Sequence, residues 1–175
     1  MSLTGQSTIP DSGRRHARWE TSLRTGTIGL VTILVLAGAV GMLGVRTTDA
    51  GASADGFELT VHHAAMTRPG LATPFSVSVR TTDDSPLPPE VTIRVSSDYL
   101  AMFDDNGMEP LPTESYNTAD WTWWTFAVPD GKDTLTVDLD ARLEPAVQWE
   151  RSGEAGLEVG GDEIVSVQFT TLVAP

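Results

Sequence analysis

The feature that most constrains this chain is an uncharged stretch between Arg24 and Arg46, which reads TGTIGLVTILVLAGAVGMLGV. An α-helix rises about 1.5 Å per residue, so a helix over residues 26–45 would be about 30 Å long, the thickness of the hydrocarbon core of a bilayer. The sequence therefore predicts a single transmembrane helix at residues 26–45.

A cleaved signal peptide is the alternative interpretation of the same stretch. Ala52-Ser53-Ala54 has the small-x-small pattern that signal peptidases accept, and cleavage would follow Ala54. The apolar cores of signal peptides usually run for about 7–15 residues, whereas this one is longer. We therefore favour a permanent signal anchor over a cleaved peptide.

The distribution of charge predicts how the chain is oriented. Residues 1–25 contain four arginines and two acids, so this segment is net positive. The chain from Arg46 onward contains 7 basic and 22 acidic residues, so it is strongly negative. Positive charge beside a membrane span stays on the cytoplasmic side, so the N-terminus is predicted to be cytoplasmic and the C-terminal domain extracytoplasmic. Residues 1–25 lack apolar periodicity and are predicted to be a disordered or weakly helical cytoplasmic tail. Ten of the 11 basic residues are arginine, which favours a bacterial source.

Small residues follow one side of the predicted helix. At 100° per residue this side carries Gly26, Gly29, Ile33, Ala37, Gly41 and Gly44. Such a stripe lets the backbone of a second helix approach closely. It is therefore a candidate docking face for another transmembrane helix, either in a second copy of the chain or in a partner membrane protein. The alternative is that glycine is simply common in membrane helices.

The apolar pattern changes to a period of two after residue 56. Residues 46–56 (RTTDAGASADG) are small and polar and predict a flexible linker. From Phe57 onward, apolar and polar residues alternate, which is typical of strands with one buried face and one exposed face. The alternating stretches are 57–61, 75–79, 91–95, 135–141 and 165–173. Clusters of Gly, Pro, Asp and Asn separate them and predict turns, as at 68–70, 83–86, 104–107, 129–131 and 160–162.

The number of strands predicts the class of fold. With Trp121–Val128 and a short strand near Leu157–Val159, residues 57–175 contain about seven strands. This number favours an all-β extracytoplasmic domain, an antiparallel β-sandwich of immunoglobulin-like architecture, with a small closed barrel as the alternative. The chain has no cysteine, so packing rather than disulfides must stabilise this domain.

The strongest candidate binding residues lie in the aromatic stretch Trp121–Phe126. Alternation places Trp124, Phe126 and Val128 on the predicted core side, which leaves Trp121 and Trp123 on the outer face. Exposed tryptophans provide a surface for sugar rings or for another protein. The competing interpretation is that a neighbouring loop covers both indoles.

Two weaker candidates concern metal ions. Asp104, Asp105 and Asn106, followed by Gly107, resemble part of a calcium loop, but a complete loop needs Glu at its twelfth position, where this chain has Ser115. We therefore favour a simple turn at residues 104–107. The adjacent His62 and His63 would point to opposite faces of a strand, so no metal site is predicted there.

The sequence contains no recognisable catalytic motif. Gly-x-Ser-x-Gly, Ser-x-x-Lys, His-Glu-x-x-His and a phosphate-binding glycine loop are all absent, and we predict neither an enzyme nor a cofactor. The acidic domain argues against binding to nucleic acid or to an anionic lipid surface. The leading hypothesis is a single-pass envelope protein whose outer domain is an accessory or assembly module for a partner membrane protein. The alternative is a membrane-anchored binding module for an envelope sugar or peptide.

Overall fold

The computed structural model describes residues 12–39, 44–146 and 149–174, without the side chains of 12–22, Ala37, Ala39, Asp105 and Asn106. The chain forms two compact units, residues Met1–Leu43 and Gly44–Pro175, and each is described by itself.

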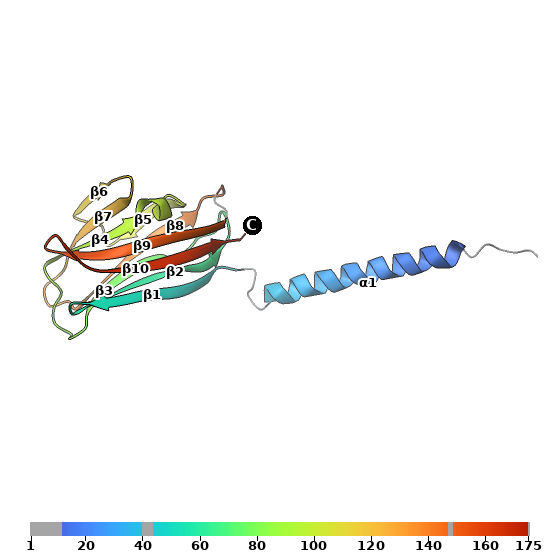
Figure 1. Ribbon diagram of the computed structural model, residues 1–175, viewed down its shortest axis with the longest axis horizontal. Helices are drawn as coiled ribbons and strands as arrows, with labels where there is room; N and C mark the ends of the chain where they lie inside the picture. The colour runs from blue at the N-terminus through green and yellow to red at the C-terminus, as the bar shows by residue number, and fades with distance from the viewer. Residues whose placement is uncertain (1–11, 40–43, 147–148, 175) are drawn as a thin grey trace, which may run out of the picture. The chain divides into compact units, whose positions relative to one another are not determined.

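The described residues of the first unit form helix α1 (Ser12–Ala39) (Figure 1). From Ser12 onward the tail is helical, which agrees with the helical alternative for residues 1–25 and not with disorder. Between Arg14 and Arg24 the chain has neither Gly nor Pro, and Arg, Ala, Glu and Leu favour a helix there.

The apolar part of α1 is uncovered within its own unit. Every side chain from Leu23 to Leu36 is exposed, and the exposed fractions of the Leu, Ile and Val side chains in this stretch lie between 51% and 65%. The predicted span at 26–45 continues into residues 40–43, which lie outside the described residues. Within the described part of the chain, no helix is long and apolar enough to cross a membrane.

The second unit is an all-β, sandwich-like domain with one short helix, α2 (Ser97–Leu100) (Figure 1). The described residues contain ten strands rather than about seven. These are β1 (Arg46–Ala54), β2 (Phe57–Thr67), β3 (Phe75–Thr81), β4 (Glu90–Ser96), β5 (Phe103–Glu109), β6 (Glu114–Asn117), β7 (Trp121–Ala127), β8 (Thr134–Leu143), β9 (Trp149–Val159) and β10 (Asp162–Val173).

Strand pairing divides the domain into two halves that face each other. One half has the order β1-β2-β3-β8-β5 and the other has the order β10-β9-β4-β7-β6. A short parallel pairing of β2 with β10, at Met66–Leu172 and Thr67–Val173, joins them. All five alternating stretches identified in the sequence lie within these strands, and their apolar residues form one shared core.

An aromatic cluster holds the two halves together. The ring of Phe75 on β3 lies 5.9 Å from that of Phe169 on β10 and 5.5 Å from that of Tyr99 in α2. Tyr99 is fully buried, and its hydroxyl donates to Oγ1 of Thr171 (2.8 Å), which in turn donates to the carbonyl of Ala64 (2.6 Å). Burial raises the pKa of Tyr99 to about 12, although the hydrogen bond to Thr171 acts in the opposite direction. This chain of hydroxyls satisfies polar groups that would otherwise be costly inside the core.

The segment predicted to be a flexible linker, residues 46–56, is instead strand β1 and a tight turn. β1 pairs with β2 along its whole length, from Arg46 to Ala54. Its alanines pack partly buried against the core, since Ala50, Ala52 and Ala54 recur at a period of two. Asp55 and Gly56 have φ values of 50° and 84°, which is the geometry of the two-residue turn that Asp-Gly favours in hairpins.

Residues 104–107 are not a turn, in contrast to the prediction. They lie in β5, which pairs with β8 and contains an irregularity between Asp105 and Gly107. An extra residue in one strand is the usual form of a β-bulge, and it explains why turn-forming residues occur inside a strand.

Candidate functional site

The outer face of the β10-β9-β4-β7-β6 half carries the strongest candidate site. Alternation along β7 places Trp124 and Phe126 in the core, where they are 7% and 1% exposed. Trp121 and Trp123 point to the opposite face and are half-buried. Neither indole is therefore free in solvent or fully covered.

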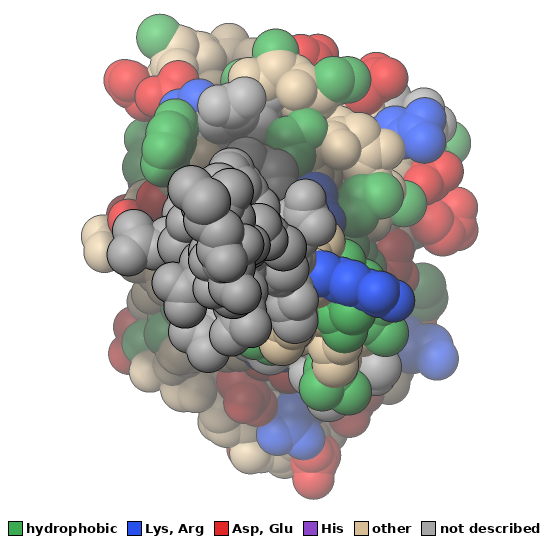
Figure 2. Space-filling view, turned by 90° about the vertical axis from the view of Figure 1, so that its right-hand side faces the viewer, with side chains coloured by type: hydrophobic (Ala, Val, Ile, Leu, Met, Phe, Trp, Pro, Cys, Tyr) green, Lys and Arg blue, Asp and Glu red, His purple; other side chains and the backbone are tan. Residues whose placement is uncertain are grey.

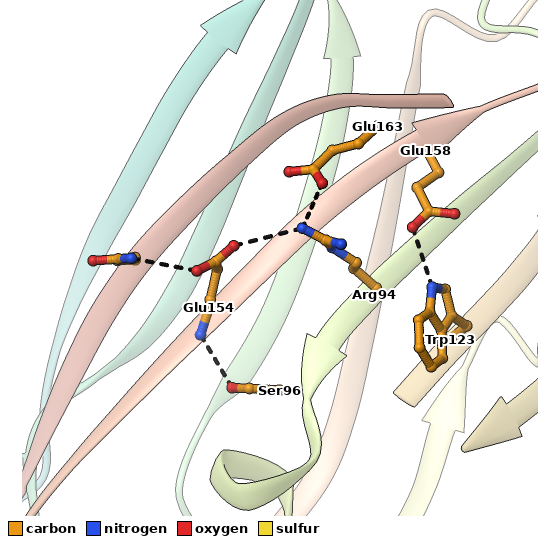
Figure 3. Close-up of polar contacts among 7 residues, drawn as sticks. Arg94, Ser96, Trp123, Glu154, Glu158 and Glu163 are labelled. Carbon is orange, nitrogen blue, oxygen red and sulfur yellow. Dashed lines mark hydrogen bonds and ion pairs between the residues drawn. The ribbon is translucent and has the colours of Figure 1, made fainter. Parts of the chain in front are cut away.

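Trp123 is fixed by two neighbours. Its ring stacks on that of Tyr116 from β6, with centroids 4.5 Å apart and planes 8° from parallel. Its indole Nε1–H donates to Oε1 of Glu158 on β9 at 3.1 Å (Figure 3). Because its ring face and its polar atom both have partners, Trp123 acts mainly as a support for the surface.

Trp121 is held beneath an arginine. The guanidinium carbon of Arg94 on β4 lies 4.2 Å from the centroid of the Trp121 ring, a cation–π arrangement. Nη2 of Arg94 also lies 2.7 Å from Oε2 of Glu163 and 3.6 Å from Oε1 of Glu154 (Figure 3). The Arg94 side chain is only 15% exposed, so it is a fixed part of the sheet surface and not a mobile surface group.

Gly156 on β9 makes this arrangement possible. It lies directly opposite Arg94 in the strand register, and a Cβ built there would be 2.7 Å from Nε of Arg94. Only a residue without a side chain lets the arginine cross β9 and reach Glu163 on β10. The Nε atom of Arg94 is buried and has no hydrogen-bond partner, which is a cost that the ion pairs and the Trp121 contact must offset.

A shallow groove of about 350 Å³ lies beside Trp121. This volume is at the lower end of the range for small-molecule sites, about 300–1,000 Å³. Polar side chains supply hydroxyl, amide and carboxylate groups along it. The lining residues are Ser96, Trp121, Ser152, Gly153, Glu154, Gln168, Phe169 and Thr170.

Hydrogen bonds hold the polar lining of the groove in place. Gln168 Nε2 donates to Oε2 of Glu154 at 3.3 Å, and the backbone N–H of Glu154 donates to Oγ of Ser96 at 3.1 Å. Oγ of Ser152 lies 3.3 Å from Oγ1 of Thr170. The groove thus combines the edge of an aromatic ring with ordered polar groups, a combination that can recognise a polar ligand of modest size.

The candidate docking face of the helix is only partly described. Nothing lies within 4 Å of the positions where Gly26 or Gly29 would carry a Cβ, and Ile33 is 65% exposed. Gly41 and the side chain of Ala37 lie outside the described residues. Gly44 lies at a bend that begins the second unit, so it is not part of α1.

The candidate calcium residues are not arranged as a loop. Asp104 lies in β5 opposite Arg142, and the side chains of Asp105 and Asn106 are outside the description. No group of three or more His, Cys, Asp or Glu side chains that could hold a metal ion occurs among the residues described.

The two histidines point to opposite faces of β2, as the sequence predicts. Nδ1 of His62 lies 2.6 Å from Oδ1 of Asp49 on β1. His63 is buried, its ring lies 5.1 Å from that of Phe169, and its Nδ1 lies 3.1 Å from the carbonyl oxygen of Ala64. Burial lowers the pKa of His63 below 6.5.

Comparisons with known proteins give little further information. No family model matches the chain, and no curated protein matches it. A solved structure, the collagen-binding domain from a Staphylococcus aureus adhesin, is similar over 69% of this chain and 99% of that chain, with 13% identity and a TM-score of 0.36. A likeness at this TM-score carries no argument about the site.

Sequence reasoning identified Trp121 and Trp123 but missed Arg94, Gly156 and the glutamates around them. A signal was present in residues 153–159, where Ala155, Leu157 and Val159 alternate with glycine and glutamate. The two glycines in this stretch, at 153 and 156, lower its apparent strand character and hide a strand of eleven residues.

Proposed function

We propose that this protein is a bacterial, single-pass membrane protein whose extracytoplasmic domain is a non-enzymatic binding module. Support for the anchor comes from the uncharged residues 25–45, and support for the orientation comes from the basic N-terminal segment and the acidic domain that follows. The binding surface is the groove beside Trp121.

The observation that carries the proposal is the fixed position of Trp121 at the side of a polar groove. Arg94 and the glutamates hold the indole in place without covering it completely, so little side-chain entropy is lost when a ligand binds. Aromatic edges flanked by hydroxyl, amide and carboxylate groups suit a sugar ring, which presents apolar C–H faces and polar hydroxyls. Glu154 and the net charge of −13 disfavour an anionic ligand. We therefore propose a neutral saccharide of the cell envelope as the ligand.

Titration of residues 44–175 with neutral oligosaccharides, followed by tryptophan fluorescence, tests this proposal. This fragment contains the complete core of the second unit, so it is expected to fold alone. Trp121→Phe should weaken binding about tenfold, equivalent to about 1.4 kcal/mol, because stacking area and rigidity are lost. Trp149→Phe, at an exposed position outside the groove lining, is the matched control and should leave the affinity unchanged. Equal affinity of the Trp121→Phe variant and the wild type would refute the assignment of the groove.

The exposed apolar surface of α1 favours a second candidate function, an accessory or assembly module for a partner membrane protein. In this case Gly29→Leu in the full chain should abolish co-purification of a partner in mild detergent, because the close approach of helices is lost. Val31→Leu, on the opposite side of the helix, should have no effect. Co-purification that is unchanged in Gly29→Leu would remove the support for this candidate.

A further inference from the structure

One end of the sandwich is adjacent in sequence to the apolar segment, and we call it the proximal end. β1 begins there with Arg46, which pairs with Met66 near the end of β2. β10 ends there, since Val173 pairs with both Thr67 and Trp149. In Figure 1 this is the end of the sandwich that carries the C-terminus.

The proximal end exposes large apolar side chains. Trp149 is 74% exposed, the largest exposed fraction among the tryptophans whose side chains the structure describes, and Leu172 and Leu71 are 41% and 40% exposed. Trp149 lies opposite the buried Val173, so regular strand geometry would direct both side chains to the same face. Instead, its φ of 74° is in the left-handed region, which is costly for a residue other than glycine, and its indole is in solvent.

The proximal end also differs from the rest of the domain in charge. It holds four of the seven basic residues that follow residue 45, namely Arg46, Arg68, Arg142 and Arg151. Five acids lie in the same strand ends and adjoining loops, namely Asp98, Asp104, Asp120, Glu144 and Glu150. The remainder of the domain has three basic and seventeen acidic residues, so nearly all of its net negative charge lies away from this end. Figure 2 views the molecule from this side, and where the sandwich is visible its basic, acidic and apolar side chains are interspersed.

We propose that the proximal end rests on the phospholipid surface of the outer leaflet, with the indole of Trp149 at the level of the headgroups. The inference depends on the proposed membrane anchor. Arg46, the first residue of β1, follows Val45 directly, so β1 begins where the uncharged stretch of the sequence ends. Tryptophan is the residue that most favours the membrane interface, and arginine side chains interact with lipid phosphates. This end is close to neutral, so it avoids most of the repulsion that the rest of the domain would meet at an anionic surface.

Fluorescence quenching in vesicles tests the inference with the full chain. A Trp19→Phe background removes the tryptophan that precedes the apolar segment, and the vesicles contain phosphatidylcholine and phosphatidylglycerol with brominated acyl chains. Bromine quenches an indole only at short range, so only tryptophans in the membrane interface lose fluorescence. Trp149→Phe should then remove most of the quenching, whereas Trp121→Phe should remove almost none.

Flotation of the vesicles in a density gradient tests the proposed membrane anchor separately from the proposed contact of Trp149 with the lipid surface. If the chain floats and Trp149→Phe removes the quenching, the inference is supported. If the chain floats and the quenching is the same in Trp149→Phe as in Trp121→Phe, the inference is overturned and the anchor stands. If the chain does not float, the anchor fails and the inference fails with it. Circular dichroism of each variant verifies that the sandwich remains folded.

Discussion

Replacing Gly156 with alanine is expected to destabilise the domain, although the new methyl group would lie on the outer face of the sheet. Its Cβ would be 2.7 Å from Nε and 3.2 Å from Cγ of Arg94. These atoms lie in the middle of a side chain that is held at its far end by Glu163, so a small rotation cannot relieve the clash. Arg94 must therefore lift away from the sheet.

The cost follows from the contacts that Arg94 would lose. Its cation–π contact with Trp121 contributes about 0.5–2 kcal/mol at a half-buried position. The ion pair with Glu163 adds about 0.2–1 kcal/mol, since the two side chains remain 15% and 42% exposed. Alanine in a strand is favoured over glycine by about 0.5–1 kcal/mol, which offsets part of this loss. At the middle of these ranges, the net destabilisation of Gly156→Ala is about 1 kcal/mol.

A double-mutant cycle tests whether the clash with Arg94 causes this loss of stability, because the effect of Gly156→Ala should change sign when Arg94 is removed. In an Arg94→Ala background no clash remains, so Gly156→Ala should stabilise the domain by about 0.5–1 kcal/mol. Urea denaturation of residues 44–175 measures the free energy of unfolding of the four proteins. If Gly156→Ala has the same sign and size in both backgrounds, the proposed role of Gly156 is refuted.

Three further predictions concern the core. Tyr99→Phe should lower the free energy of unfolding by about 1–2 kcal/mol because it removes the hydrogen bond to the buried Thr171 hydroxyl, and an unchanged urea midpoint would contradict this. Gly153→Ala should cost about 1–3 kcal/mol, measured in the same way, because its Cβ would lie 2.7 Å from the rings of Phe169 and Tyr99. The lowered pKa of His63 means that its contribution to stability is present above pH 6.5 and is lost as the pH falls through the folded-state value. Melting temperatures measured from pH 7.5 to 5 should therefore fall less steeply in His63→Leu than in the wild type, and parallel curves would refute this assignment.

The long strands of the core could be predicted because their side chains are large and alternate regularly. Val91, Ile93 and Val95 in β4 are an example, since all three are buried. β1 was not predicted as a strand because its inward residues are alanines. Alanine has little apolar area to bury, and it is also common in flexible linkers. β6 has no buried residue, so no pattern could reveal it.

The tryptophans of the site were visible in the sequence, but the site itself was not. Alternation within β7 places Trp121 on the outer face, and this requires only local information. The contacts of Arg94 with β7, β9 and β10 depend on which strands are neighbours, and alternation does not specify strand order. The need for glycine at 156 follows from the same long-range register.

The direct junction between Val45 and β1 has a mechanical consequence. A pulling force transmitted through Arg46 and directed away from the sandwich acts along the axis of β1. All nine residues of β1 are paired with β2, so such a load shears these hydrogen bonds together and does not open them one after another. If the groove holds a cell-wall ligand while the anchor is pulled, β1 is the element that bears the tension.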